Sequence, residues 1–172
     1  LIDLNKINFL NEKKSTFILK TIKKYLKSFA KKNTPNKVKL IYYNKSSVLV
    51  PHDLFDDKNS LNYLKYNTRI QINDLAANDL ILEDQINNVY IPYTDINNYI
   101  FEKFKAFDFY HYSSVLLEKL SNELTDNFSQ KVFLNINNSF IDILYFKNKQ
   151  LIFFNSFDYK SKQDILYYLL FT

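Results

Sequence analysis

A short polar segment between two apolar runs holds the residues whose spacing could bind a phosphate. It reads N-I-N-N-S-F and lies between the runs V-F-L and I-D-I-L-Y-F. Polar turns between two strands hold nucleotide phosphates in some folds, usually with an aspartate and a glycine. This chain contains no glycine, so asparagine must adopt the left-handed backbone conformation that a tight turn requires. The segment could be a phosphate site, the remnant of one, or a plain hairpin. The candidate phosphate-binding residues are Asn135, Asn137, Asn138 and Ser139.

A histidine followed by two serines suggests nucleophilic catalysis at first sight. His111 precedes Ser113 and Ser114 at the end of an apolar run. Adjacency in sequence is not the geometry of a catalytic triad, in which the base reaches the nucleophile across the fold. We therefore expect Ser113 to cap a helix, and we assign no catalytic residue.

Carboxylates offer two further candidate sites. Asp53, Asp56 and Asp57 follow His52 and could bind a metal ion, but acidic residues at a helix start also interact favourably with the helix dipole. The second explanation is the expected one, and no metal site is assigned. Asp142 interrupts an apolar run and could be a residual catalytic carboxylate. We expect it on the solvent face of its strand or paired with a lysine.

Composition removes several classes of site. The chain has 172 residues, 47% of them hydrophobic, which is enough for one medium domain or two small ones. Glycine, cysteine, methionine and tryptophan are absent, while asparagine, lysine and isoleucine are abundant, as expected of an AT-rich genome. The absences exclude glycine-rich phosphate loops, disulfides and thiol nucleophiles. No apolar run approaches the roughly 20 residues that span a bilayer, and no signal peptide is evident, so a soluble, cytoplasmic protein is expected.

Positive charge is concentrated near the start of the sequence. Residues 1–45 contain 12 lysines against Asp3 and Glu12, whereas the rest of the chain is mildly acidic. A helix in this region would place four lysines on one stripe, which is a candidate anion-binding surface. The lysines of this stripe are Lys20, Lys24, Lys27 and Lys31.

Nucleic acid and an anionic membrane surface are two polyanions that the stripe could contact. Tyr42, Tyr43 and Lys45 could add a platform on which bases stack. The chain has a single arginine, Arg69, where phosphate and base recognition would favour several. Solvated lysines that reflect codon usage, and aromatic residues that fill the core, are therefore the favoured interpretation.

Hydrophobic periodicity predicts alternating helices and strands in the first part of the chain. The first two strands are joined by Asn44 and Lys45, as in a hairpin. Thr94 or Asp95 could cap the third helix. Helices are predicted over 15–32, 59–66, 94–104 and from 113 onward, and strands over 38–43, 47–50, 79–83, 89–91 and 107–110.

Polar residues 126–131 break this pattern and mark the candidate domain boundary. Three strands separated by short polar turns follow, over 131–136, 141–146 and 151–157, as in an antiparallel meander. Ser161 and Asp164 have the spacing of a capping box at the start of a helix through Leu170. That helix is apolar nearly all round, so we expect it to be covered, including by structure that continues after Thr172.

Three stretches carry a resemblance to a known family. They read LVPHDLFDDKNSLNYLKYN, YHYSSVLLEKL and KVFLNINNSFIDILYFKNKQLIFFNSFDYKSKQDILYYLLF. They resemble uncharacterised proteins typical of the Bacteroidota, which have an actin-like ATPase fold of the ribonuclease-H type. The layout is more distantly similar to the pilus-assembly protein PilM and the division protein FtsA. The resemblance implies an α/β fold with mixed α+β sheets, incomplete at one or both ends, in which residues 1–127 are a partial first actin-like domain and residues 128–172 begin the second.

The resemblance also implies where a nucleotide would bind. In nucleotide-binding relatives, an Asp-x-Gly motif on the first hairpin of the second domain contacts phosphate and metal-bound water, and the matching positions are Asn135 and Asn137. Asparagine lacks the charge that favours Mg²⁺, and its side chain crowds the space that glycine leaves open. We therefore expect an actin-like scaffold or protein-binding protein that needs no cofactor and does not hydrolyse ATP. An ATP-binding, Mg²⁺-dependent actin-like ATPase and an RNA- or ribosome-associated module that uses the basic helix are the alternatives.

Overall fold

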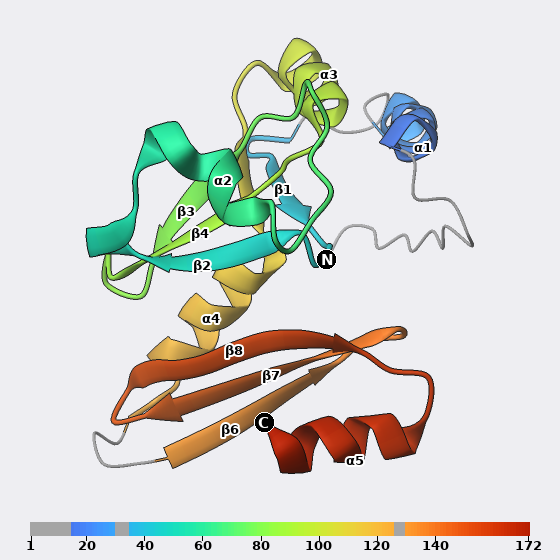
Figure 1. The fold of residues 1–172 in the computed structure, drawn as a ribbon. Coiled ribbons are helices and arrows are strands. Elements are labelled where there is room, and N and C mark those ends of the chain that lie inside the picture. Colours follow the sequence, from blue (N-terminus) through green and yellow to red (C-terminus); the bar gives the residue numbers. More distant parts are fainter. Residues whose placement is uncertain (1–14, 30–34, 126–129) are drawn as a thin grey trace. The chain divides into compact units, whose positions relative to one another are not determined.

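The computed structural model describes residues 15–29, 35–125 and 130–172 of the chain (Figure 1). Its elements group into two compact units. The first contains the described residues up to Leu80 together with Asp84–Tyr112, and the second contains Ile81–Glu83 together with Ser113–Thr172. Both units combine helices with strands, as predicted for a mixed α/β chain.

The first unit contains every element that periodicity predicts there, with bounds shifted by a few residues. The end predicted for the first helix, at Lys32, lies outside the described residues. The elements are α1 (Ser15–Phe29), β1 (Lys39–Tyr42), β2 (Ser47–Pro51), the 3-10 turns η1 (His52–Leu54) and η2 (Asp57–Asn59), α2 (Ser60–Leu64), β3 (Ala77–Ile81), β4 (Ile86–Tyr90), α3 (Thr94–Phe104) and β5 (Asp108–His111).

Strands β1 and β2 do not form the predicted hairpin. β1 pairs in parallel with β5, and Tyr42 lies opposite His111 at the end of that pair. β2 pairs antiparallel with β4 in a separate sheet of order β2-β4-β3. The Tyr42 ring is buried and packs edge-on against Phe109 and Tyr93. Core contacts from distant elements therefore fix β1, and the turn at Asn44 does not pair it with β2.

A small apolar core supports the three-stranded sheet of the first unit. Leu64 of α2 and Val89 of β4 are fully buried, and Val50 of β2 packs with them. Burying each such side chain contributes about 1.5–3 kcal/mol. This core holds the loop from η1 to α2 against the sheet.

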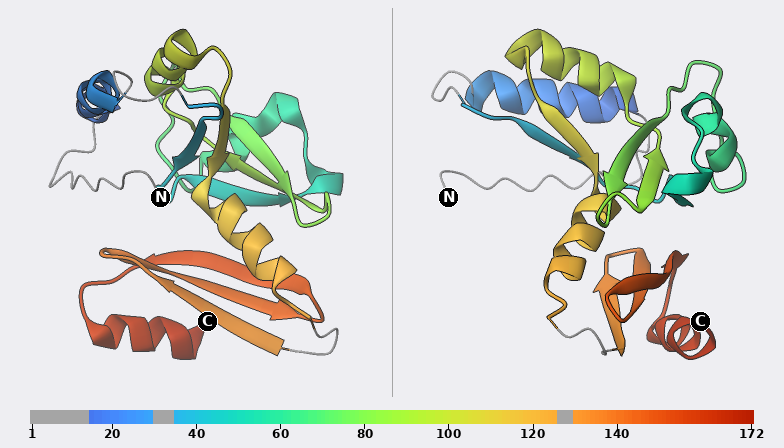
Figure 2. Two further views of the ribbon diagram at one scale, coloured as in Figure 1. Left: turned by 180° about the vertical axis from the view of Figure 1, so that it is seen from behind. Right: turned by 90° about the vertical axis from the view of Figure 1, so that its left-hand side faces the viewer.

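Helix α1 lies along α3 in both views of Figure 2. The Lys103 ammonium group donates a hydrogen bond of 2.9 Å to the carbonyl oxygen of Leu26. The Lys23 ammonium group lies 5.0 Å from the centre of the Tyr99 ring, within cation–π range. These contacts orient α1 so that its remaining lysines face solvent.

Two predicted helix caps are wrong because each helix begins earlier than its pattern suggests. Tyr93 is the N-cap residue of α3, without a side-chain capping bond, so neither Thr94 nor Asp95 caps it. Helix α4 (Tyr112–Asn122) begins at Tyr112, so Ser113 lies inside its first turn and is fully buried.

The second unit contains the predicted meander. Strands β6 (Gln130–Ile136), β7 (Phe140–Lys147) and β8 (Gln150–Asp158) form an antiparallel sheet of order β6-β7-β8. Helix α5 (Lys162–Phe171) follows, and its capping box is confirmed. The Ser161 hydroxyl accepts from the Asp164 amide at 3.2 Å, and the Asp164 carboxylate accepts from the Ser161 amide at 3.0 Å.

Helices α4 and α5 lie on opposite faces of the meander sheet (Figure 2). The α5 face is identified by Phe157 of β8, whose ring stacks on that of Tyr168 at 4.4 Å. Phe157 lies opposite Ile141, so Ile141 points toward α5 and its neighbour Asp142 points toward the other face.

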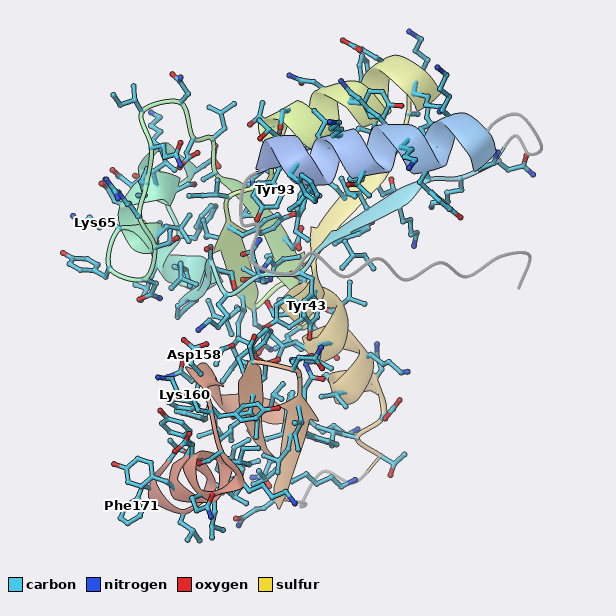
Figure 3. All side chains as sticks on the ribbon, turned by 90° about the vertical axis from the view of Figure 1, so that its right-hand side faces the viewer. Tyr43, Lys65, Tyr93, Asp158, Lys160 and Phe171 are labelled. Carbon is cyan, nitrogen blue, oxygen red and sulfur yellow. The ribbon has the colours of Figure 1, made fainter. Side chains whose placement is uncertain are left out.

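Helix α5 is largely exposed in the described part of the chain. None of its residues is buried, and Leu170 and Phe171 are 69% and 74% exposed. Figure 3 shows Phe171 at the far end of this helix, away from the sheet. Among the described helices, none is long and apolar enough to cross a membrane.

Backbone geometry reflects the absence of glycine. A left-handed conformation costs a residue other than glycine about 1–2 kcal/mol, although asparagine and aspartate tolerate it better. The Ala106 amide donates to the Phe104 carbonyl at 2.8 Å, which closes a strained three-residue turn at Lys105. Within the described residues, positive φ angles are found at Leu82, Glu83, Asp84, Lys105, Asn148 and Lys149.

Candidate functional site

The candidate phosphate turn joins β6 to β7 in the second unit. Asn135 is the penultimate residue of β6, and Asn137, Asn138 and Ser139 form the turn itself. The backbone amide of Asn137 donates to the carbonyl oxygen of Phe140 at 2.9 Å, which closes the hairpin. Asn138 and Ser139 are exposed at its tip. The sequence therefore placed the turn correctly.

A buried carboxylate holds the side chain of Asn135. Asn135, Asp142 and Ser156 lie opposite one another on β6, β7 and β8. The Asp142 carboxylate accepts from the Asn135 amide at 2.7 Å and from the Ser156 hydroxyl at 2.5 Å. Asp142 is fully buried, so the expectation that it faces solvent is wrong. Neutral side chains on the two neighbouring strands donate to its carboxylate.

Tyr159, which directly follows β8, closes over the turn. Its amide donates to the Ser139 carbonyl at 3.2 Å, and its hydroxyl donates to the Asn137 carbonyl. Asp158 lies opposite Phe140 at the end of β8 and is exposed. Figure 3 shows Asp158 and Lys160 at the connection between β8 and α5. The turn is thus held by its own unit through two of its carbonyl groups.

The residues at this turn do not fit a Mg²⁺-nucleotide. A hydrated Mg²⁺ ion prefers carboxylate ligands, but position 135 is an amide whose nitrogen already donates to Asp142. The side chain of Asp142 is fully buried, and its carboxylate accepts hydrogen bonds from Asn135 and Ser156. Asn137 carries a side chain where close backbone approach to phosphate favours glycine. The described part of the chain contains no group of three or more metal-ligating side chains.

His111 is a buried core residue of the first unit. It is fully buried at the end of β5, with the rings of Tyr90 and Tyr112 at 5.2 and 4.8 Å. Its backbone amide donates to the Asp79 carboxylate at 2.9 Å, and the other oxygen of Asp79 accepts from the Tyr90 hydroxyl. Loss of hydration on burial lowers the pKa of His111 to about 4, so the imidazole is neutral at pH 7. This environment is that of a packing residue.

Residues of the group around His52 make hydrogen bonds with their neighbours. Asp56 caps η2, because its carboxylate accepts from the Lys58 amide at 3.0 Å and from the Asn59 side chain at 2.7 Å. His52 is exposed, and its Nδ1 lies 2.8 Å from the side-chain oxygen of Asn87. Asp53 and Asp57 are exposed at the starts of their short 3-10 turns, as expected for acidic residues there.

The basic stripe of α1 is partly described. Lys20, Lys24 and Lys27 are exposed, and Lys31 lies outside the described residues. The predicted stacking platform is divided, because Tyr42 is in the core whereas Tyr43 is 53% exposed. Burial raises the pKa of Tyr42, and its hydroxyl donates to the Asn97 side chain at 2.6 Å. Only the tyrosine that follows β1 is therefore available to a partner.

Sequence reasoning missed Ser156 and Tyr159. Both lie in F-N-S-F-D-Y, which reads as the end of an ordinary strand. A regular hairpin around Asn148 and Lys149 would place Asn155 opposite Asp142, and the register shift between Tyr145 and Phe146 places Ser156 there instead. Nothing in the sequence alone directs the Tyr159 hydroxyl back to the turn.

Comparison with known proteins agrees with this architecture. A crystal structure from Bacteroides thetaiotaomicron VPI-5482, described as a protein with an actin-like ATPase fold and unknown function, superposes with a TM-score of 0.79 at 20% sequence identity. The match covers 90% of this chain and 60% of that one, so this chain spans less than two thirds of its neighbour's length. The fold is therefore actin-like, as predicted. No curated protein matches the chain. Residues 5–172 match the family described as protein of unknown function (DUF3822), and the chain belongs to that family.

Proposed function

We propose that this chain is an actin-like binding domain that does not hydrolyse ATP. The observation that carries the proposal is the hydrogen bond of 2.7 Å from Asn135 to the buried Asp142. This bond joins the side chain of Asn135, one of the candidate phosphate-binding residues, to a partner within the same sheet. A hydrolytic site needs a carboxylate that can reach metal-bound water, and the described carboxylate closest to Asn135 in the sheet is inaccessible.

Exposed apolar side chains support a protein partner. Val132 and Ile136 of β6 are 55% and 56% exposed, and the end residues of α5, Leu170 and Phe171, are 69% and 74% exposed. Ile136 lies opposite Ile141, which points toward α5, so these β6 side chains share the α5 side of the sheet. Exposed apolar side chains gathered on one side of a sheet are consistent with a docking surface. Binding of a hydrophobic dye that the paired changes Leu170→Lys and Phe171→Lys leave unaltered would argue against this role.

ATP turnover by the purified chain tests the absence of hydrolysis. With ATP and Mg²⁺ in excess, phosphate release should equal that of buffer for the wild type, Asn135→Ala and Asn155→Ala. Asn155 is the matched control, because it is an exposed asparagine of β8 that lies opposite Ile143 and hence on the other face of the sheet. Turnover that Asn135→Ala abolishes and Asn155→Ala preserves would overturn the proposal and favour an actin-like ATPase.

A further inference from the structure

The parallel strands β1 and β5 present an exposed face with an unusual combination of side chains. Ile41 lies opposite Tyr110, and the two are 49% and 36% exposed. Tyr43 continues the same face one step beyond β1 and is 53% exposed. The opposite face of these strands carries Tyr42 and His111, which are buried. Tyr110 therefore belongs to the solvent side of this sheet, and so does the exposed part of Tyr43, whose ring packs at 4.3 Å against the buried ring of Tyr112.

Cations accompany these rings. The Lys39 ammonium group lies 5.8 Å from the centre of the Tyr110 ring, and Lys45 is exposed just after Tyr43. The face has one carboxylate, Asp108, which Lys37 neutralises in an ion pair of 3.0 Å. The sequence between Glu12 and Asp53 contains no acidic residue at all. This face therefore combines aromatic rings with net positive charge.

We propose that this face, defined by Lys39, Ile41, Tyr43, Lys45 and Tyr110, binds single-stranded nucleic acid. Exposed aromatic rings beside lysines bind such strands because every base has a face that stacks, while the lysines neutralise phosphates. Tyr43 and Tyr110 are diagonal neighbours on this face, because Tyr110 lies opposite Ile41 and Tyr43 is two residues further along the chain. The proposal is independent of the absence of ATP hydrolysis.

Two other polyanionic partners fit the face less well. A membrane surface favours a broad apolar side that can enter the lipid, and this face offers Ile41 as its only aliphatic side chain among the five. Helix α1 cannot supply that apolar side, because it packs against α3. An acidic protein segment would use the lysines but has no need of two exposed rings. Stacking is the contact that distinguishes a nucleic-acid strand from both.

Fluorescence anisotropy with labelled oligouridylate and oligothymidylate tests the proposal on the full chain. Binding should weaken as salt is raised, and Tyr43→Ala and Tyr110→Ala should each weaken it by about five- to a hundredfold. Tyr110→Phe should bind like the wild type, because stacking uses the ring and not the hydroxyl. Comparing the two probes separates RNA from DNA as the preferred strand.

Tyr66→Ala is the matched control. Tyr66 is 83% exposed and has Lys65 5.1 Å from its ring centre, so it repeats the ring–cation pair away from the β1–β5 face. Its removal should leave the affinity unchanged. The proposal is overturned if neither probe binds at low salt, or if the three alanine variants behave alike. Binding to anionic phosphatidylserine vesicles without binding to either probe would also overturn it and assign the face to a membrane.

Discussion

Removing the buried carboxylate of Asp142 should destabilise the second unit strongly. Asp142→Ala deletes two hydrogen bonds to a charged acceptor, each worth about 1.5–3 kcal/mol, and leaves the Asn135 amide and the Ser156 hydroxyl without that acceptor. Part of the loss is offset, because the variant no longer buries a charge. A net loss of about 3–4 kcal/mol is expected, which is a large fraction of the stability of a typical domain.

Urea denaturation followed by far-ultraviolet circular dichroism measures this loss. With a slope of about 2 kcal/mol per molar urea, Asp142→Ala should lower the midpoint of unfolding by roughly 1.5–2 M. Asn135→Ala removes one donor and should cost about half as much. Because the two residues share a bond, the double variant should be more stable than the sum of the single losses predicts, by about 1–2 kcal/mol.

The control for this series is Asn155→Ala, an exposed change on the same sheet. Its free energy of unfolding should stay within about 0.5 kcal/mol of the wild type. If Asp142→Ala behaved like this control, the carboxylate would not be a buried acceptor. The reasoning that commits Asn135 to an internal role would then fail.

Three further predictions concern single residues of both units. Because the pKa of His111 falls from 6.5 in the unfolded chain to about 4 in the folded one, stability should be complete above pH 6.5 and decline by up to about 3 kcal/mol as the pH drops toward 4; melts of His111→Gln should lack this decline. Lys149→Gly should raise the free energy of unfolding by about 0.5–1 kcal/mol, since its φ is 65°, whereas Lys147→Gly within β7 should lower it. Ser161→Ala should cost about 1 kcal/mol by the same measurement, because it removes the cap of α5.

Local patterns in the sequence predicted local structure well. The capping box of α5 depends on two residues three positions apart, and the structure contains both of its bonds. The meander follows from strand-length apolar runs and short polar turns, of which Asn148 and Lys149 have the positive φ angles of a tight hairpin. Such features need no knowledge of distant contacts.

Long-range pairing escaped prediction. β1 and β2 look like a hairpin because Asn44 is a good turn residue, yet β1 pairs with a strand that begins at Asp108. The partners of Asp142 are Asn135 on one neighbouring strand and Ser156 on the other, so its burial depends on register. A lone aspartate in an apolar run reads as a solvent-facing residue until those partners are known.

The candidate site illustrates the same limit. The position of the turn followed from sequence, which also led to the prediction that asparagine suits Mg²⁺ poorly. The closure of the turn by Tyr159 did not, because it depends on how the chain leaves β8. The exposed face of β1 and β5 was not predicted either, because the pairing of these strands decides that Tyr42 is buried and Tyr43 is exposed.

Calorimetric titration of the purified chain with ATP and Mg²⁺ tests the central claim most directly. Because Asn135 is committed to Asp142 and Tyr159 closes over the turn, no saturable binding heat is expected. Saturable binding of ATP that Asn135→Ala abolishes and Asn155→Ala preserves would contradict the account and make the turn a nucleotide site.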